Sequence, residues 1–178
     1  MALQPGVLAV AAATGLDWFL GDPRWMLHPV VVMGWWIQAS RRGLESWARD
    51  APWRLRISGG LITLVLVVSS GLLGWAIEWV SRMAGVVGWT VLVIALASAL
   101  AGRSLYDSVM AVLQALPEQA SDEPTLARQK LSWIVGRDVT QLGRVGILRA
   151  CAETASENAV DGLFAPLFWM AAGCLLWR

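Results

Sequence analysis

Apolar stretches long enough to cross a membrane alternate along the chain with loops that carry most of its charge. A transmembrane helix needs about 20 consecutive apolar residues, and the pattern predicts four spans, two of them short. They cover residues 3–20, 57–80, 86–100 and 162–177. Two acidic residues lie inside them, Asp17 and Glu78. Because a charge deep in a bilayer is costly, we expect both near helix ends.

The pattern therefore predicts an all-α, polytopic membrane protein, with residues 1–178 forming one membrane domain. A secretory signal peptide is the alternative for residues 3–20. However, the starting sequence MALQPG has no basic residue, so we expect this segment to be retained.

Composition agrees with a membrane protein, since 57% of residues are hydrophobic, 15% are charged and 12 are Trp. The formal net charge of +1 gives no reason to expect a nucleic-acid partner. Cys151 and Cys174 lie in helical surroundings. We expect both thiols to be reduced and to pack against neighbouring side chains, rather than to form a disulfide or a metal site.

Basic residues predict the orientation in the cell membrane. Residues 21–56 and 101–161 each hold six Lys or Arg, whereas the connection between the two middle spans holds only Arg82. By the positive-inside rule, both long loops are cytoplasmic. Three tryptophans flank the outer connection, as interfacial aromatics do: Trp75, Trp79 and Trp89.

The first loop reads GDPRWMLHPVVVMGWWI and begins with a chain turn, because Gly21 and Pro23 both disfavour a continuing helix. His28 is a candidate general base or ligand, and the alternative is a hydrogen-bonded structural role. Residues 30–44 have an apolar side and end near Arg41 and Arg42. They predict a helix lying along the membrane surface.

The second loop predicts further helices. Arg103 and Asp107 are spaced to pair on one of them. A break follows at residues 117–124, then a helix over residues 125–135. Asp138, with Gln141 three residues on, predicts the N-cap of the next helix.

That next helix carries acidic residues at every fourth position. Successive steps of four residues drift by only about 40° on a helix, so Arg149, Glu153, Glu157 and Asp161 form one stripe, with Asn158 beside it. Like charges at this spacing repel. Arg149 neutralises one carboxylate, and the other two need a basic side chain, a shared proton or a divalent cation. Mg²⁺ prefers such oxygen ligands.

A solvated helix face is the alternative explanation of this stripe. Small residues beside it favour close approach of another helix instead. They are Cys151, Ala152, Ala155, Ala159 and Val160.

Three segments together resemble the adenosylcobinamide-phosphate synthase family of cobalamin biosynthesis (CobD/CbiB). They are GDPRWMLHPVVVMGWWI, VGRDVTQL and RACAETASENAVDGLFAPLFW, in the family's order. Thr154 and Ser156 depart from the family's usual Ser and Ala. Family members are longer, so the chain resembles their N-terminal portion and is expected to be a fragment of a longer member.

The resemblance implies an ATP- and Mg²⁺-dependent ligase. It would join aminopropanol or its phosphate to a propionate carboxylate of the corrinoid adenosylcobyric acid. Glu153, Glu157, Asp161 and His28 are the expected catalytic residues, the three acids also being expected metal ligands. The expected substrate-binding residues are Asp22, Arg137, Asp138, Arg149 and Asn158. Other membrane enzymes of cobalamin biosynthesis are expected partners.

Two other functions stay open. A non-catalytic membrane sensor of the same superfamily would tolerate loss of the acidic stripe. A small-molecule transporter would more often interrupt its spans with Gly or Pro, and residues 57–80 contain no Pro. ATP use rests on the resemblance alone, since the chain contains neither GxxxxGK[ST] nor GxGxxG.

Overall fold

The computed structural model describes residues 4–21, 29–48, 51–119 and 122–176, and every regular element in these ranges is a helix. The predicted all-α class is confirmed. The chain divides into two compact units, Met1–Asp22 with Ala99–Arg178 (unit 1) and Pro23–Ser98 (unit 2). Each is described by itself.

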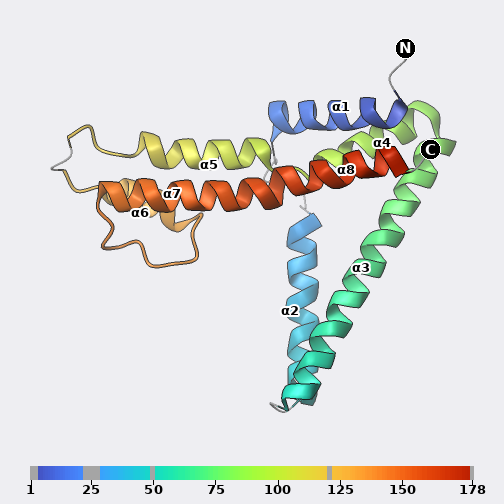
Figure 1. The fold of residues 1–178 in the computed structure, drawn as a ribbon, viewed down its shortest axis with the longest axis horizontal. Coiled ribbons are helices and arrows are strands. Elements are labelled where there is room, and N and C mark those ends of the chain that lie inside the picture. The colour runs from blue at the N-terminus through green and yellow to red at the C-terminus, as the bar shows by residue number, and fades with distance from the viewer. Residues whose placement is uncertain (1–3, 22–28, 49–50, 120–121, 177–178) are drawn as a thin grey trace. The chain divides into compact units, whose positions relative to one another are not determined.

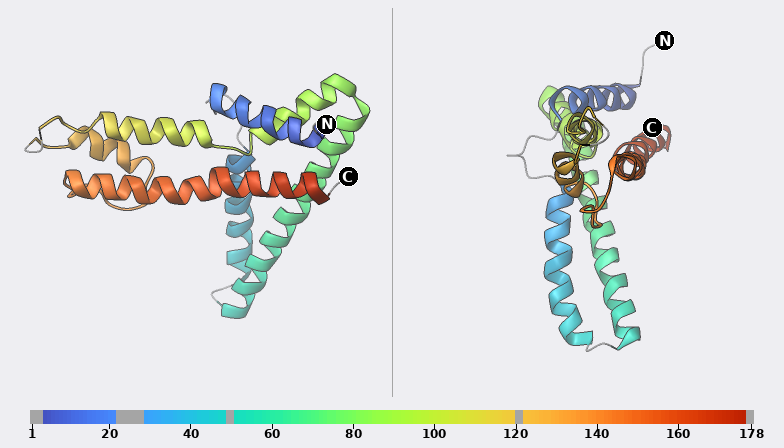
Figure 2. Two further views of the ribbon diagram at one scale, coloured as in Figure 1. Left: turned by 45° about the horizontal axis from the view of Figure 1, so that its top comes forward. Right: turned by 90° about the vertical axis from the view of Figure 1, so that its left-hand side faces the viewer.

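Unit 1 is built around a long helical rod (Figure 1). The rod consists of α7, a π-helical turn η1, and α8. Helix α5 lies beside α7, and α1 lies beside α8, as both views of Figure 2 also show. The helices of this unit are α1 (Pro5–Leu20), α5 (Gly102–Gln114), α6 (Thr125–Ser132), α7 (Arg144–Ala159), η1 (Val160–Phe164) and α8 (Ala165–Leu176).

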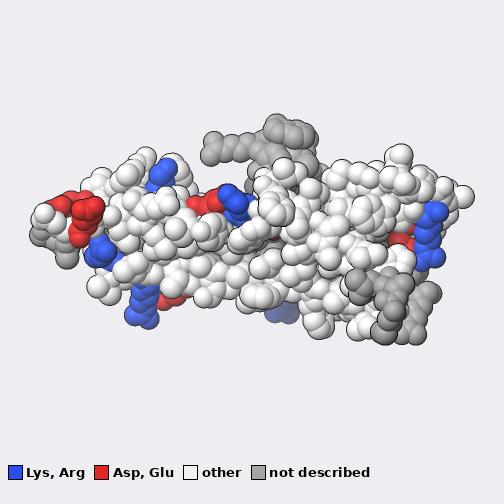
Figure 3. Space-filling view, turned by 90° about the horizontal axis from the view of Figure 1, so that it is seen from above, with Lys and Arg blue, Asp and Glu red and all other residues white. Residues whose placement is uncertain are grey.

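The core of unit 1 lies where α5, α6 and α7 meet. Ile147, Ala150 and Cys151 are spaced to share one side of α7, and all three are buried there. They pack with Val112 of α5 and Leu131 of α6. Charged side chains gather at this end of the unit, around the loops that flank α6 (Figure 3). This end is therefore the polar part of unit 1, with its own small apolar core.

Unit 2 contains α2 (Pro29–Ala48), α3 (Pro52–Met83) and α4 (Gly85–Ala97). Helices α2 and α3 form an antiparallel hairpin (Figure 2). Gly85 has φ +54°, which favours glycine at the turn into α4. A Cβ on Gly88 would lie 2.5 Å from the carbonyl oxygen of Val80, so this glycine lets α4 start close to the end of α3.

Residues 30–44 are helical as expected, within the longer α2. Helix α2 contacts α3 within unit 2. That this helix lies along the membrane surface stays a prediction.

Length and composition allow three helical stretches to cross a membrane: Pro52–Met83, Gly85–Gln114 and Arg144–Leu175. The predicted first span corresponds to the shorter apolar helix α1. The fourth predicted span does not start afresh at Gly162, since α7 continues through η1 into α8. Both acids lie near helix ends, as expected: Asp17 is in the last turn of α1, and Glu78 is within the last two turns of α3 and pairs with Arg82.

Two helix boundaries differ from the prediction. Helix α6 ends at Ser132 rather than near residue 135, because Trp133 and Ile134 donate i→i+3 bonds that tighten the last turn. Helix α7 begins at Arg144 with Gly143 as its N-cap, so the expected cap at Asp138 is wrong.

Candidate functional site

A buried carboxylate joins α1 to α5 within unit 1. Asp17 is 5% exposed, and its Oδ2 accepts a hydrogen bond from the backbone N–H of Gly102 at 3.1 Å. Gly102 is the first residue of α5, whose leading N–H groups have no partner inside the helix. A carboxylate also interacts favourably with the positive end of the helix dipole. Asp17 therefore caps α5 from a neighbouring helix, which explains an acid in an apolar helix.

A π-helical turn, η1, contains the last residue of the acidic stripe, and Pro166 explains where it forms. In an α-helix the carbonyl of Gly162 would accept from the N–H of residue 166, but proline has none. The turn widens, with Ala165 N–H donating to Val160 O instead. The Gly162 carbonyl accepts from Ala101 N–H at 2.9 Å. Sequence analysis missed this turn, although a proline four residues after a glycine was its signal.

Ala101 and Gly102 thus give consecutive N–H groups to two different elements, η1 and α1. Space at this junction is limited. A Cβ on Gly102 would lie 2.9 Å from Asp17 Oδ2 and 3.3 Å from Leu163 Cδ1. The junction ties the start of α5 to the turn that holds Asp161. Since π-turns recur at functional sites, it is a candidate structural support for the site.

A second contact closes α1 onto α5. Gly21 ends α1 with φ +59°, and its N–H donates to Asp17 O at 2.7 Å. Arg103 donates from Nη1 to the Trp18 carbonyl at 3.4 Å and pairs with Asp107 through Nε, as its spacing predicts. The predicted Arg103–Asp107 pair is confirmed.

Glu153 is the neutralised member of the acidic stripe. Its Oε1 accepts from Arg149 Nε at 3.0 Å and its Oε2 accepts from Arg137 Nη2 at 2.6 Å. Arg149 comes from the same helix, one turn earlier, whereas Arg137 comes from the loop before α7. The expected neutralisation by Arg149 is confirmed, and Arg137 adds a second cation. Both guanidinium groups remain accessible, with side chains 81% and 56% exposed.

Glu157 and Asp161 differ from Glu153. Neither has an ion pair within the described residues, and both are exposed, as is Asn158, whose Nδ2 donates to the Thr154 carbonyl. The described part of the chain does not enclose them. The reason is that the buried side of α7 faces α5 and α6, and the stripe lies away from it. Of the small residues beside the stripe, Cys151 is buried.

The π-turn also bends the stripe. The four-residue spacing assumes one regular α-helix, but Glu157 lies in α7 and Asp161 lies in η1. A wider turn changes the direction in which Asp161 leaves the helix axis. Among the described residues, no group of three His, Cys, Asp or Glu is placed to hold a metal ion. Mg²⁺ in proteins is usually held by one or two carboxylates together with substrate phosphates, and binding of such a metal by Glu157 and Asp161 stays a prediction.

Asp138 forms a local turn instead of a helix cap. Its Oδ1 accepts from the backbone N–H of Thr140 at 2.9 Å. This bond lowers the pKa of the Asp138 carboxyl. Aspartate two residues before a free N–H favours such a turn over an α-helix, which is why α7 starts later than predicted. The turn follows Arg137 directly and so helps to position it.

The predicted site residues Asp22 and His28 lie outside the described residues. The residues that the structure brings together are Arg137, Arg149 and Glu153, next to Glu157 on the same helix. In its fold and site, the chain is an all-helical membrane protein with a charged stripe running into an apolar helix.

Comparison with known proteins defines the family. The family model described as CobD/Cbib protein matches residues 10–178, and the chain belongs to this family. "Cobalamin biosynthesis protein CobD" of Pelobacter propionicus is 41% identical over 96% of the chain and 51% of its own length. The protein of that name from Klebsiella pneumoniae is 42% identical over 94% of the chain and 51% of its own length.

"Cobalamin biosynthesis protein CbiB" of Salmonella choleraesuis is 38% identical, again over 94% of the chain and 51% of its own length. The chain therefore spans about half the length of the curated relatives it matches. No solved structure matches it significantly.

Proposed function

We propose that the chain takes part in cobalamin biosynthesis as part of a membrane ligase. The reaction would join the amine of aminopropanol or its phosphate to a propionate carboxylate of adenosylcobyric acid. Family membership and the names of the relatives support the pathway. The observation that carries the site is the pairing of Arg137 and Arg149 on Glu153, beside Glu157, which has no ion pair among the described residues.

Amide formation needs an activated carboxylate, because a free carboxylate does not react with an amine at neutral pH. Mg²⁺-ATP would supply the activation by converting the carboxylate into a species with a phosphate leaving group. The amine nitrogen then attacks the carbonyl carbon, the bond to the leaving group breaks, and the amine loses a proton. Positioning, charge neutralisation and proton removal are what the chain's residues can contribute.

Arg137 and Arg149 suit the anionic side of this reaction, since a guanidinium group binds planar carboxylates and phosphates through two parallel bonds. Glu153 keeps the two groups oriented while they remain exposed. Glu157 and Asp161 suit the cationic side, either the ammonium group of the aminopropanol or Mg²⁺ on the nucleotide. His28 and Asp22 are included in this proposal only because they belong to the motif GDPRWMLHPVVVMGWWI.

A complementation experiment tests the proposal in cells that lack their own gene of this family. With this chain expressed and adenosylcobyric acid supplied, the expected product is adenosylcobinamide or its phosphate, detected by chromatography of corrinoids. The control is the same strain supplied with cobinamide, which bypasses the step. If cobinamide alone restores cobalamin synthesis, the chain does not catalyse the step by itself.

The exposure of the stripe favours a second candidate, a non-catalytic sensor of the same superfamily. A sensor would bind a corrinoid without converting it. Purified chain that shifts the corrin absorbance of adenosylcobyric acid, yet makes no amide with aminopropanol phosphate and Mg²⁺-ATP, would support this candidate.

A further inference from the structure

The end of the α2–α3 hairpin gathers arginine and tryptophan around the connection between the two helices. We call residues 41–48 and 51–56 the hairpin tip. The sequence from Arg41 to Arg56 contains five Arg, one Glu and one Asp, a formal charge of +3. We propose that the hairpin tip binds the headgroups of anionic phospholipids, with Arg42 and Arg56 contacting phosphate. This proposal does not rest on the reaction proposed above.

The arginines of the hairpin tip differ in whether their guanidinium groups already have partners within the tip. Arg41 is paired with Glu45 one turn away. The guanidinium group of Arg54 lies over two indole rings, 5.3 Å from the centre of the Trp47 ring and 5.1 Å from that of Trp53. Its Nη1 also donates to the Trp47 carbonyl at 3.4 Å. These two cations are held by groups of the tip itself.

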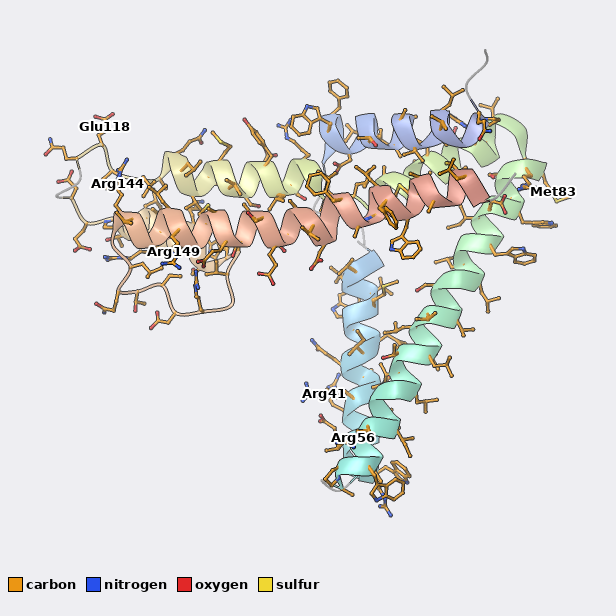
Figure 4. All side chains as sticks on the ribbon, viewed as in Figure 1. Arg41, Arg56, Met83, Glu118, Arg144 and Arg149 are labelled. Carbon is orange, nitrogen blue, oxygen red and sulfur yellow. The ribbon has the colours of Figure 1, made fainter. Side chains whose placement is uncertain are left out.

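Arg42 and Arg56 remain available. Arg42 uses its Nε for the Gln38 carbonyl at 3.3 Å, which leaves its terminal nitrogens for other acceptors. Arg56 is exposed and has no hydrogen bond or ion pair within the described residues. Arg41 and Arg56 are labelled in Figure 4, near the end of the hairpin where α2 connects to α3.

The two indoles suit the boundary between lipid and water. Trp47 and Trp53 are 51% and 57% exposed. The cation of Arg54 holds both rings at the tip, and tryptophan favours the membrane interface because its ring is apolar with one polar N–H. Residues 57–80 of α3 form the apolar stretch, so it begins directly after Arg56. The tip therefore lies where an apolar helix meets polar surroundings.

Charge favours an anionic headgroup over a neutral one. A zwitterionic lipid carries an ammonium group that offsets its phosphate, whereas phosphatidylglycerol keeps a net negative charge. One arginine near an anionic surface contributes about fivefold in affinity. Arginine also binds phosphate through two parallel bonds. Two available arginines beside two anchored indoles thus fit phosphatidylglycerol or a similar lipid.

Electron spin resonance of spin-labelled lipids tests the proposal in the full chain reconstituted in phosphatidylcholine bilayers. The measured quantity is the association of labelled phosphatidylglycerol relative to labelled phosphatidylcholine. We expect the wild-type chain to prefer phosphatidylglycerol. The double variant Arg42→Gln with Arg56→Gln should lower that preference by about fivefold or more. Arg42→Lys with Arg56→Lys should retain most of it, since the charge remains.

Arg41→Gln is the matched control, because Arg41 is already neutralised by Glu45; it should change the preference little. Thermal unfolding in detergent checks that all variants fold alike. Equal association of both lipids with the wild-type chain would overturn the proposal. So would an Arg41→Gln effect as large as that of the double variant, which indicates a general charge effect.

Discussion

The backbone N–H of Gly102 donates to Oδ2 of Asp17 at 3.1 Å, across 85 residues of sequence. This bond gives the first turn of α5 a carboxylate cap from α1. It also explains why residue 102 is a glycine, because any side chain would displace the acceptor. The contact links α1 to the turn that carries Asp161, since Ala101 binds Gly162 beside it.

Gly102→Ala should destabilise unit 1. The new Cβ would lie 2.9 Å from Asp17 Oδ2 and 3.3 Å from Leu163 Cδ1, and such overpacking typically costs about 1–3 kcal/mol in unfolding free energy. Thermal unfolding in detergent measures it. Gly173→Ala in α8 is the control, since its Cβ would meet nothing within 4 Å. A Gly102→Ala midpoint equal to that of Gly173→Ala would contradict the tight junction.

Pro166→Ala should loosen the contact between η1 and Ala101. The new N–H at residue 166 competes for the Gly162 carbonyl, which Ala101 now uses. We expect the Ala101 amide to exchange its hydrogen about fivefold faster, since one hydrogen bond contributes about 1 kcal/mol. Hydrogen exchange followed by mass spectrometry measures this. Pro5→Ala, at the first residue of α1, should leave Ala101 exchange unchanged, and unchanged exchange in Pro166→Ala would refute our explanation of the π-turn.

Glu157→Gln should abolish product formation in the cell assay while leaving expression and membrane insertion near normal. The substitution keeps the side-chain shape and removes a charge that has no ion-pair partner in the described residues. Ser156→Ala, also exposed on α7, is the control and should retain activity. If Glu157→Gln, Glu153→Gln and Asp161→Asn all retain product formation at limiting Mg²⁺, the stripe is a solvated helix face.

Acid should weaken the turn before α7. Hydrogen bonding from Thr140 lowers the pKa of Asp138 in the folded chain, so the bond is fully present above the ordinary carboxyl pKa and is lost as pH falls through the lowered value. The NMR shift of the Thr140 amide should titrate with a midpoint below about 3.9, the unperturbed value. Asp138→Asn should show no such titration. A wild-type midpoint at or above the unperturbed value is the contrary result.

Cysteine labelling in intact cells should place both Arg-rich loops in the cytoplasm. On a background without Cys151 and Cys174, an impermeant reagent should react with a cysteine at Ala84, which lies between the predicted spans 57–80 and 86–100 and is exposed. It should not react at Ser46 or Gln119 until the membrane is permeabilised. Labelling at Ser46 or Gln119 in intact cells, with none at Ala84, would reverse the orientation.

The local sequence pattern alone determined the helical class of this protein, the positions of several helices and two ion pairs. Apolar stretches predicted the helical membrane class and the positions of α1, α3 and α4, because burial of apolar side chains in lipid depends on composition over one segment. Spacing predicted the Arg103–Asp107 and Arg149–Glu153 pairs, since residues four apart are neighbours on any α-helix. The three motifs alone indicated the family.

The tertiary structure decided the contacts between segments that are far apart in the sequence. The cap of α5 needs Asp17, and the second cation on Glu153 comes from Arg137, 16 residues away. No helical spacing encodes either contact. The start of α7 was mispredicted because a side-chain bond within the loop competes with a helix cap at Asp138. The π-turn follows from Pro166, but the donor that satisfies the freed Gly162 carbonyl comes from Ala101, which only the packing of the chain places there.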